Sequence, residues 1–139
     1  MWKRPIWYEN FFALLSSKKR NRDTVKYLLL ISVSEQVDEQ LNEEKFQRIA
    51  SDCDIIMQQM REQGIVEYST ILVPTYSATT VRVRQGKIEL VDGPFAEAKE
   101  RICGCCLVKC DNLDYAIELA RRIPSVTYGS VEIRPVYTF

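Results

Sequence analysis

Apolar and polar residues alternate along Thr79–Val91, on both sides of the dipeptide Gln85-Gly86. Alternation with a period of two is typical of a β-strand that is buried on one face. A two-residue connection that contains glycine is typical of a tight hairpin turn. The segment therefore predicts a β-hairpin in which Arg84 faces Lys87, Val83 faces Ile88, Arg82 faces Glu89 and Val81 faces Leu90. In this register the four aliphatic side chains share one face, and the opposite charges pair on the other.

Two segments have the apolar spacing of helices. Between Glu43 and Gln63 apolar residues recur every three or four positions, and Gly64 follows where a helix C-terminus favours glycine. A second stripe follows the dipeptide Asp111-Asn112, either residue of which can cap a helix N-terminus. The first stripe consists of Phe46, Ile49, Ala50, Cys53, Ile56, Met57 and Met60, and the second of Leu113, Ala116, Ile117 and Ala120.

Four apolar runs predict the strands of a larger sheet. Lys26–Val33 is nearly continuous in apolar residues, as expected for a strand that is buried on both faces. The others are Ile65–Val73, which Pro74 closes, Ile102–Lys109, and Ser130–Tyr137, where Pro135 favours an edge position.

The predicted elements follow the order strand, helix, strand, inserted hairpin, strand, helix and strand. Two helices on one face of a mostly antiparallel sheet form an α+β sandwich. The strands carry apolar residues on both faces, for example Leu28 and Leu30 on one and Leu29 and Ile31 on the other. Since the helices cover one face only, we expect a second copy of the chain to cover the other, sheet against sheet.

The composition is that of one globular domain. The chain has 139 residues, enough to bury a substantial core, and nineteen basic residues balance nineteen acidic ones. A neutral chain has no overall field that attracts nucleic acid or a membrane, and no apolar stretch reaches the ~18 residues that a transmembrane helix needs. Five cysteines without a secretory signal favour reduced thiols in a cytoplasmic protein.

Residues 1–24 differ from the rest of the chain. Six basic residues against two acidic ones give them a net charge of +4, and they hold both tryptophans as well as Tyr8, Phe11 and Phe12. Three interpretations are open: a disordered or loosely docked tail, a functional anchor to a membrane surface or a polyanion, and a misassigned start with the native chain beginning at Val25. In each case residues 25–139 form a single domain.

The tetrapeptide Asp-Gly-Pro-Phe at 92–95 ends the hairpin abruptly and leads into a charged run. Asp92 can accept hydrogen bonds from backbone N–H groups that follow it, and Gly93 permits an unusual backbone angle. Two interpretations are open. The segment is a rigid corner, or it is the lip of a pocket at which a stiff loop presents Asp92, Glu97 and Lys99.

The stretch TVRVRQGKIELVDGPFAEAKE, together with DNLDYAIELARRIPS and GSVEIRPV, resembles the DGPF group of the YCII-related domain family. The resemblance covers most of the chain and implies a ferredoxin-like βαββαβ protomer with an inserted hairpin, which pairs into a dimeric α/β barrel. Most members of that family have no assigned activity. Some are thought to work through a His-Asp pair, but this chain contains no histidine, so that activity does not carry over.

Without histidine, proton transfer near neutral pH requires a carboxylate or a lysine whose pKa is shifted by burial. Asp92 with Lys99, flanked by Glu97, is the constellation that is close enough in sequence for such a shift. In a reaction of the lyase or isomerase kind, Asp92 or Glu97 would be the base and Lys99 the acid or charge stabiliser. Charges that simply pair with one another would give the same pattern.

Four of the five cysteines are clustered: Cys103, Cys105, Cys106 and Cys110. In a strand the first two point to one face and the last two to the other, so the sulfurs converge on a metal only if a bulge intervenes, which Gly104 could permit. A reactive thiol would lack an imidazole to activate it. We therefore interpret them as small apolar fillers of a buried strand, and we expect no metal and no cofactor.

The leading hypothesis is a homodimer that binds a small polar or anionic molecule in a cleft beside the hairpin. The expected polar contacts are Arg82, Asp92, Gly93, Glu97 and Lys99, and the expected apolar wall is Phe95 with Tyr76. The alternatives are the small lyase or isomerase, and a non-catalytic partner-binding dimer linked to transcription regulation. We expect no nucleic acid, because residues 25–139 are acidic, and no membrane contact except through residues 1–24.

Overall fold

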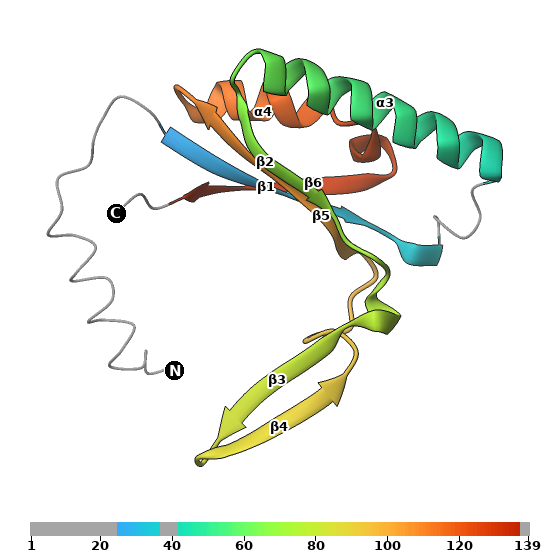
Figure 1. Cartoon of the computed structure of the whole chain (residues 1–139), viewed down its shortest axis with the longest axis vertical. Helices are drawn as coiled ribbons and strands as arrows, with labels where there is room; N and C mark the ends of the chain where they lie inside the picture. The colour runs from blue at the N-terminus through green and yellow to red at the C-terminus, as the bar shows by residue number, and fades with distance from the viewer. Residues whose placement is uncertain (1–24, 37–41, 137–139) are drawn as a thin grey trace, which may run out of the picture.

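The computed structural model describes residues 25–36 and 42–136. Four strands, β1 Val25–Val33, β2 Val66–Ile71, β5 Arg101–Cys110 and β6 Gly129–Val136, form one sheet in the order β2-β5-β1-β6. Every neighbouring pair in this sheet is antiparallel. The helices α3 Glu43–Glu62 and α4 Leu113–Arg121 lie on one face of it (Figure 1). The hairpin strands, β3 Thr79–Arg84 and β4 Lys87–Asp92, form a separate two-stranded sheet.

The connections follow two interleaved β-α-β units. Helix α3 joins β1 to β2, and these two strands flank β5; helix α4 joins β5 to β6, and these two flank β1. The hairpin is inserted between β2 and β5. This α+β arrangement confirms the predicted order of elements and is compatible with a ferredoxin-like protomer.

The predicted helix boundaries agree closely with the structure. The side chain of Asn42 caps α3 by accepting from the backbone N–H of Lys45, and that of Asn112 caps α4 by accepting from the N–H of Tyr115. Each cap satisfies a donor that the first turn of a helix leaves without a partner. Within the described residues, neither helix is long and apolar enough to cross a membrane.

All four strands of the sheet differ from their predicted ranges by one or two residues at an end, and β1 and β5 are slightly longer than predicted. β2 ends at Ile71, two residues early, because Pro74 directs the chain into the short 3₁₀ helix η1, Thr75–Ser77. β6 begins at Gly129 and is followed to Val136; the predicted end at Tyr137 lies outside the described residues. The interpretations of residues 1–24 also lie outside them and stay predictions.

The core lies between the sheet and the two helices. Its largest fully buried side chains are Leu29, Met60, Leu119, Ile123, Val108 and Cys106. Leu29 on β1 pairs with Cys106 on β5, so this cysteine occupies a central core position. Burial raises the pKa of the Cys106 thiol to about 11, and the side chain therefore stays neutral and acts as a small apolar filler, as predicted.

The opposite face of the sheet also has an apolar centre. Leu28 on β1 pairs with Leu107 on β5, and Leu30 pairs with Cys105; these side chains are half-buried, and neither helix lies on their side (Figure 1). At one edge of this face Glu67 binds Lys26 at 2.9 Å and Lys109 at 2.8 Å. We call this surface the open face.

The hairpin has the predicted register. Arg84 pairs with Lys87, and Val81 pairs with Leu90. Gln85 and Gly86 both have positive φ values, 50° and 75°, which a two-residue turn of this kind requires. Arg82 pairs with Glu89 along the ladder, but no ion pair joins the two side chains among the described residues. The predicted register is therefore confirmed, whereas the expected ion pair between Arg82 and Glu89 is not formed.

The core assignment predicts unequal costs for two leucine truncations. Leu29→Ala should lower the free energy of unfolding by about 3 kcal/mol, because the side chain is fully buried and its removal leaves a cavity. Leu113→Ala, at the half-exposed first turn of α4, should cost less than about 1 kcal/mol. Urea unfolding followed by circular dichroism measures both, and equal losses would contradict the placement of the core.

Candidate functional site

The hairpin is tied to itself at its base. The backbone N–H of Gly93 donates to the carbonyl of Ala78 at 2.7 Å, and the hydroxyl of Thr80 donates to the carbonyl of Gly93 at 2.8 Å. Gly93 adopts φ 106°, in a region that residues with a side chain rarely occupy. These contacts support the interpretation of the Asp-Gly-Pro-Phe segment as a corner, and its role as the lip of a pocket stays a prediction.

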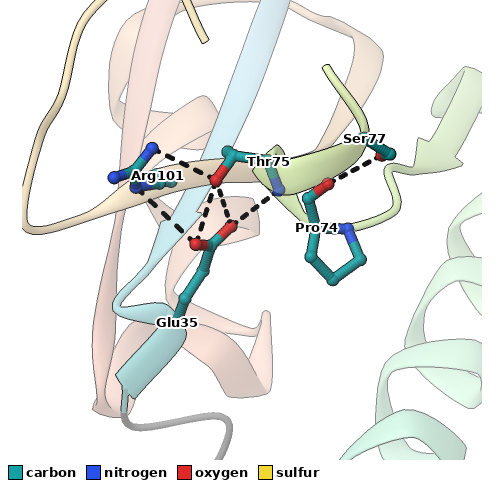
Figure 2. A network of polar contacts seen from close by, with 5 residues as sticks. All are labelled: Glu35, Pro74, Thr75, Ser77 and Arg101. Atoms are coloured by element: carbon teal, nitrogen blue, oxygen red, sulfur yellow. Dashed lines mark hydrogen bonds and ion pairs between the residues drawn. The ribbon is translucent and has the colours of Figure 1, made fainter. Parts of the chain in front are cut away.

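A second set of contacts ties the hairpin base to the four-stranded sheet (Figure 2). The carboxylate of Glu35, just after β1, accepts from the backbone N–H of Thr75 at 2.8 Å and from its hydroxyl at 2.7 and 3.0 Å. That hydroxyl accepts from the guanidinium of Arg101 at 3.1 Å, and the Arg101 Nε lies 3.7 Å from the carboxylate. We call these three residues, Glu35, Thr75 and Arg101, the anchor cluster.

The anchor cluster suits a structural role better than a catalytic one. Its hydrogen bonds, first from the backbone of Thr75 and then from its hydroxyl, hold the pKa of Glu35 below its ordinary value, with a smaller contribution from Arg101. A carboxylate with a lowered pKa is a weaker base. The Thr75 hydroxyl is fully engaged between an acceptor and a donor. The cluster therefore positions the segment that leads into the hairpin.

The residues predicted to form the site lie around this base, and most face solvent. Asp92 ends β4, whereas Glu97 and Lys99 follow in the loop before β5, and all three are exposed. In the described part of the chain no ion pair joins Asp92 to Lys99. The rings of Phe95 and Tyr76 are 80% and 85% exposed. A single protomer therefore presents these groups without enclosing a ligand among them.

Arg82 differs from its neighbours. It lies in the middle of β3, on the face opposite to the aliphatic residues, and is half-buried. Its Nε is buried and has no hydrogen-bond partner, the one such side-chain atom among the described residues. A buried donor without an acceptor costs about 1–3 kcal/mol, and a guanidinium donor costs more. Of the residues predicted to contact a ligand, Arg82 is thus the one with a buried donor that has no acceptor.

The anchor cluster was missed from the sequence. Glu35 and Thr75 are 40 positions apart, and Thr75 and Arg101 are 26 apart, so no local pattern connects them. The available signal was weak: a carboxylate directly after a buried strand, and a threonine directly after Pro74. Contacts between residues so far apart in sequence depend on the strand order, which brings the end of β1 beside the start of β5.

The cysteine cluster is arranged as its alternation predicts. Cys106 and Cys110 are buried towards the helices, whereas Cys103 and Cys105 are half-buried, and none of the five cysteines forms a disulfide among the described residues. The β1–β5 register shifts beside Gly104, which places a bulge at Cys103. Even with this bulge, the described residues contain no group of three or more His, Cys, Asp or Glu side chains that could hold a metal ion.

The lowered pKa of Glu35 makes a prediction about acid stability. A carboxyl group whose pKa is lower in the folded than in the unfolded chain stabilises the fold above the unfolded pKa, and this contribution is lost as the pH falls through the folded value. At neutral pH Glu35→Gln should therefore lower the free energy of unfolding by about 1 kcal/mol, given its partly exposed position. Well below the ordinary pKa of 4.5 the difference from the native protein should disappear.

Urea unfolding across this pH range is the measurement, and Glu89→Gln, an exposed carboxylate on the hairpin, is the control. If Glu35→Gln lowers the free energy of unfolding by the same amount at neutral and at acid pH, the charge of Glu35 does not hold the anchor cluster together.

Two comparisons with known proteins place the chain. Residues 25–139 match the YCII-related domain. The chain is also similar to an uncharacterised protein of Rhizobium meliloti (strain 1021), with 34% identity over 112 residues, which cover 79% of this chain and 90% of that protein. Both the extent of the match and the identity are sufficient to assign a family, so the protein is a member of the YCII-related domain family.

Proposed function

We propose that the protein is a cytoplasmic homodimer that binds a small anionic molecule beside the hairpin base. The observation that carries this proposal is the buried Nε of Arg82, which has no acceptor in the described structure. A carboxylate or phosphate oxygen would supply one once the Arg82 side chain turns to expose this donor, and a guanidinium binds such groups through charge-assisted hydrogen bonds. The lack of disulfides among the described cysteines is compatible with the proposed reducing compartment.

The loop at the hairpin base supplies the remaining contacts. Asp92, Glu97 and Lys99 add charged groups of both signs, and the stiff turn at Gly93 holds the loop in place. Phe95 and Tyr76 provide apolar rings, but as both are largely exposed, they form a wall only when something covers them. In the proposal that cover is a second copy, so the cleft is complete only in the dimer.

The open face also supports a second copy of the chain as the partner. Its leucines, Leu28, Leu30 and Leu107, lie on the side of the sheet opposite to α3 and α4. Two such faces packed together would bury them, in the manner of a dimeric α/β barrel of ferredoxin-like protomers. The area of a four-stranded sheet face is of the order of the ~800 Å² per partner that a stable interface buries.

Binding is favoured over the lyase or isomerase alternative. Proton transfer by Asp92, Glu97 or Lys99 would require surroundings that exclude water, and all three side chains are exposed in the protomer. No contact of the described residues specifically favours the partner-binding dimer without a ligand.

Arg82 provides a test of ligand binding. In a thermal-shift screen of small carboxylates and inorganic phosphate, a ligand that stabilises the native protein should bind Arg82→Gln at least about 10-fold more weakly, because one charge-assisted contact is lost. Arg48→Gln, which removes an exposed guanidinium from α3, is the control and should bind normally. Equal affinity of Arg82→Gln and the native protein for every ligand would refute the assignment.

The open face provides a test of assembly. Leu30→Arg places a charge at its centre and should weaken the dimer at least about 100-fold, because an unpaired charge would be buried. Ile117→Arg, on the outer side of α4 and 40% exposed, should leave the dimer intact. Analytical ultracentrifugation measures both, and a native protein that stays monomeric at every concentration, or a dimer that tolerates Leu30→Arg, would overturn the proposal.

A further inference from the structure

The hairpin extends from the rest of the fold like an arm (Figure 1), and we call it the arm. Its aliphatic residues share one face, and the ladder register places three basic residues, Arg82, Arg84 and Lys87, on the opposite face. Glu89 is the one acidic residue of that face, which we call the cationic face. Residues 25–139 as a whole contain more acidic than basic residues, so this positive charge is a local feature of the arm.

Two of the basic residues face each other directly across the ladder. Arg84 pairs with Lys87 in the last pair before the turn, where opposed side chains begin about 5 Å apart. Like charges in opposed positions repel each other and destabilise a hairpin. The Arg84 guanidinium donates to the carbonyl of Val83 at 3.0 Å, and among the described residues neither Arg84 nor Lys87 has an acidic partner. An anion between the two side chains would replace this repulsion by attraction.

Arg82 adds a third cation to the same face. It lies two positions before Arg84 on β3, about 7 Å away, and diagonally across the ladder from Lys87 at a similar distance. Glu89 is directly opposite Arg82, yet within the described part of the chain no ion pair joins them, and the Arg82 Nε has no acceptor. Glu89 offsets one of the three positive charges, so the face has two positive charges left to balance.

The three cations lie on the outer part of the cationic face, away from the corner at Gly93. At the corner end, the Thr80 hydroxyl donates to the carbonyl of Gly93 at 2.8 Å and therefore has no proton left to donate to an anion. Arg84 and Lys87 are exposed, and Arg82 is half-buried between them and the corner. An anionic molecule that binds Arg82 therefore finds further donors towards the turn.

We propose that the molecule bound at Arg82 carries two anionic groups, as a diphosphate or a dicarboxylate does. One group binds Arg82, whose side chain turns to present its donors, and the other lies between Arg84 and Lys87. Linked anionic groups bind two cationic positions more tightly than one group binds one position, because the second contact forms within the same complex. The inference rests on the proposed function for the role of Arg82, and it adds Arg84 and Lys87 as the residues that select the class of ligand.

Paired ligands test the number of anionic groups. In isothermal titration calorimetry of the full chain, pyrophosphate should bind at least about 10-fold more tightly than inorganic phosphate, because a second charge-assisted contact is made. Succinate and acetate are the matched pair for carboxylates. The tighter ligand of pyrophosphate and succinate then shows whether the face prefers phosphate or carboxylate groups. Equal affinities within both pairs would overturn the inference, as would the absence of binding by all four ligands.

Neutral variants separate this site from a general attraction between opposite charges. Arg84→Gln and Lys87→Gln should each weaken pyrophosphate binding about 10-fold but change phosphate binding less than about 2-fold, because Arg82 binds the single group. Glu89→Gln removes the carboxylate of the face and should strengthen pyrophosphate binding about 2-fold or more. All three positions are exposed, so the variants should fold. Lys45→Gln, which removes an exposed cation from α3, is the control and should bind both ligands normally.

The variants also distinguish a failure of this inference from a failure of the proposed function. If Arg82→Gln loses phosphate binding while Arg84→Gln and Lys87→Gln bind pyrophosphate as the native protein does, the inference is overturned and the proposed function stands. Unchanged binding of both ligands by Arg82→Gln would refute the two together. If Lys45→Gln weakens pyrophosphate binding as much as Lys87→Gln does, the attraction is general and the inference is also overturned.

Discussion

The carboxylate of Glu35 connects the end of β1 to the start of the hairpin, and the direction of the hairpin depends on this contact. It accepts hydrogen bonds from the backbone and the hydroxyl of Thr75, while Arg101 braces the same hydroxyl from β5. Through this cluster the sheet sets where the arm leaves the fold. The turn at Gly93 then sets where the chain returns. Because the contacts of Gly93 join the two ends of the hairpin at its base, the anchor cluster positions both of its strands, and Arg82 with them, relative to the sheet.

Within the described residues, two apolar surfaces stay uncovered. The two helices occupy one side of the sheet, so Leu28, Leu30 and Leu107 line the other, and the aliphatic side chains of the hairpin, Val81, Val83, Ile88 and Leu90, are exposed. The groups expected to bind a ligand lie between these surfaces, at the hairpin base. A partner that covers both surfaces would therefore also enclose Phe95, Tyr76 and the loop charges. Assembly and ligand binding are thus parts of a single proposal rather than two.

The sequence was informative where the determinants are local. The hairpin register follows from alternation and a two-residue turn, and the cap at Asn112 follows from a short-range hydrogen bond. The alternation of the cysteines also predicted which of them share a face of the strand, but not that Cys103 and Cys105 are only half-buried. The anchor cluster could not be predicted, because it joins residues that only the strand order brings together. Nor could the sequence show that Arg82 and Glu89, although paired along the ladder, form no ion pair, since side-chain geometry decides this.

The central claim is that a second copy covers the open face and completes the site at the hairpin base. Hydroxyl-radical footprinting of the full chain at increasing protein concentration tests it most directly. Phe95 at the hairpin base and Leu30 on the open face should become protected over the same concentration range, while the exposed Ile117 on α4 stays reactive. Full reactivity of Phe95 at concentrations where Leu30 is protected, or no protection of either residue at any concentration, would contradict the claim.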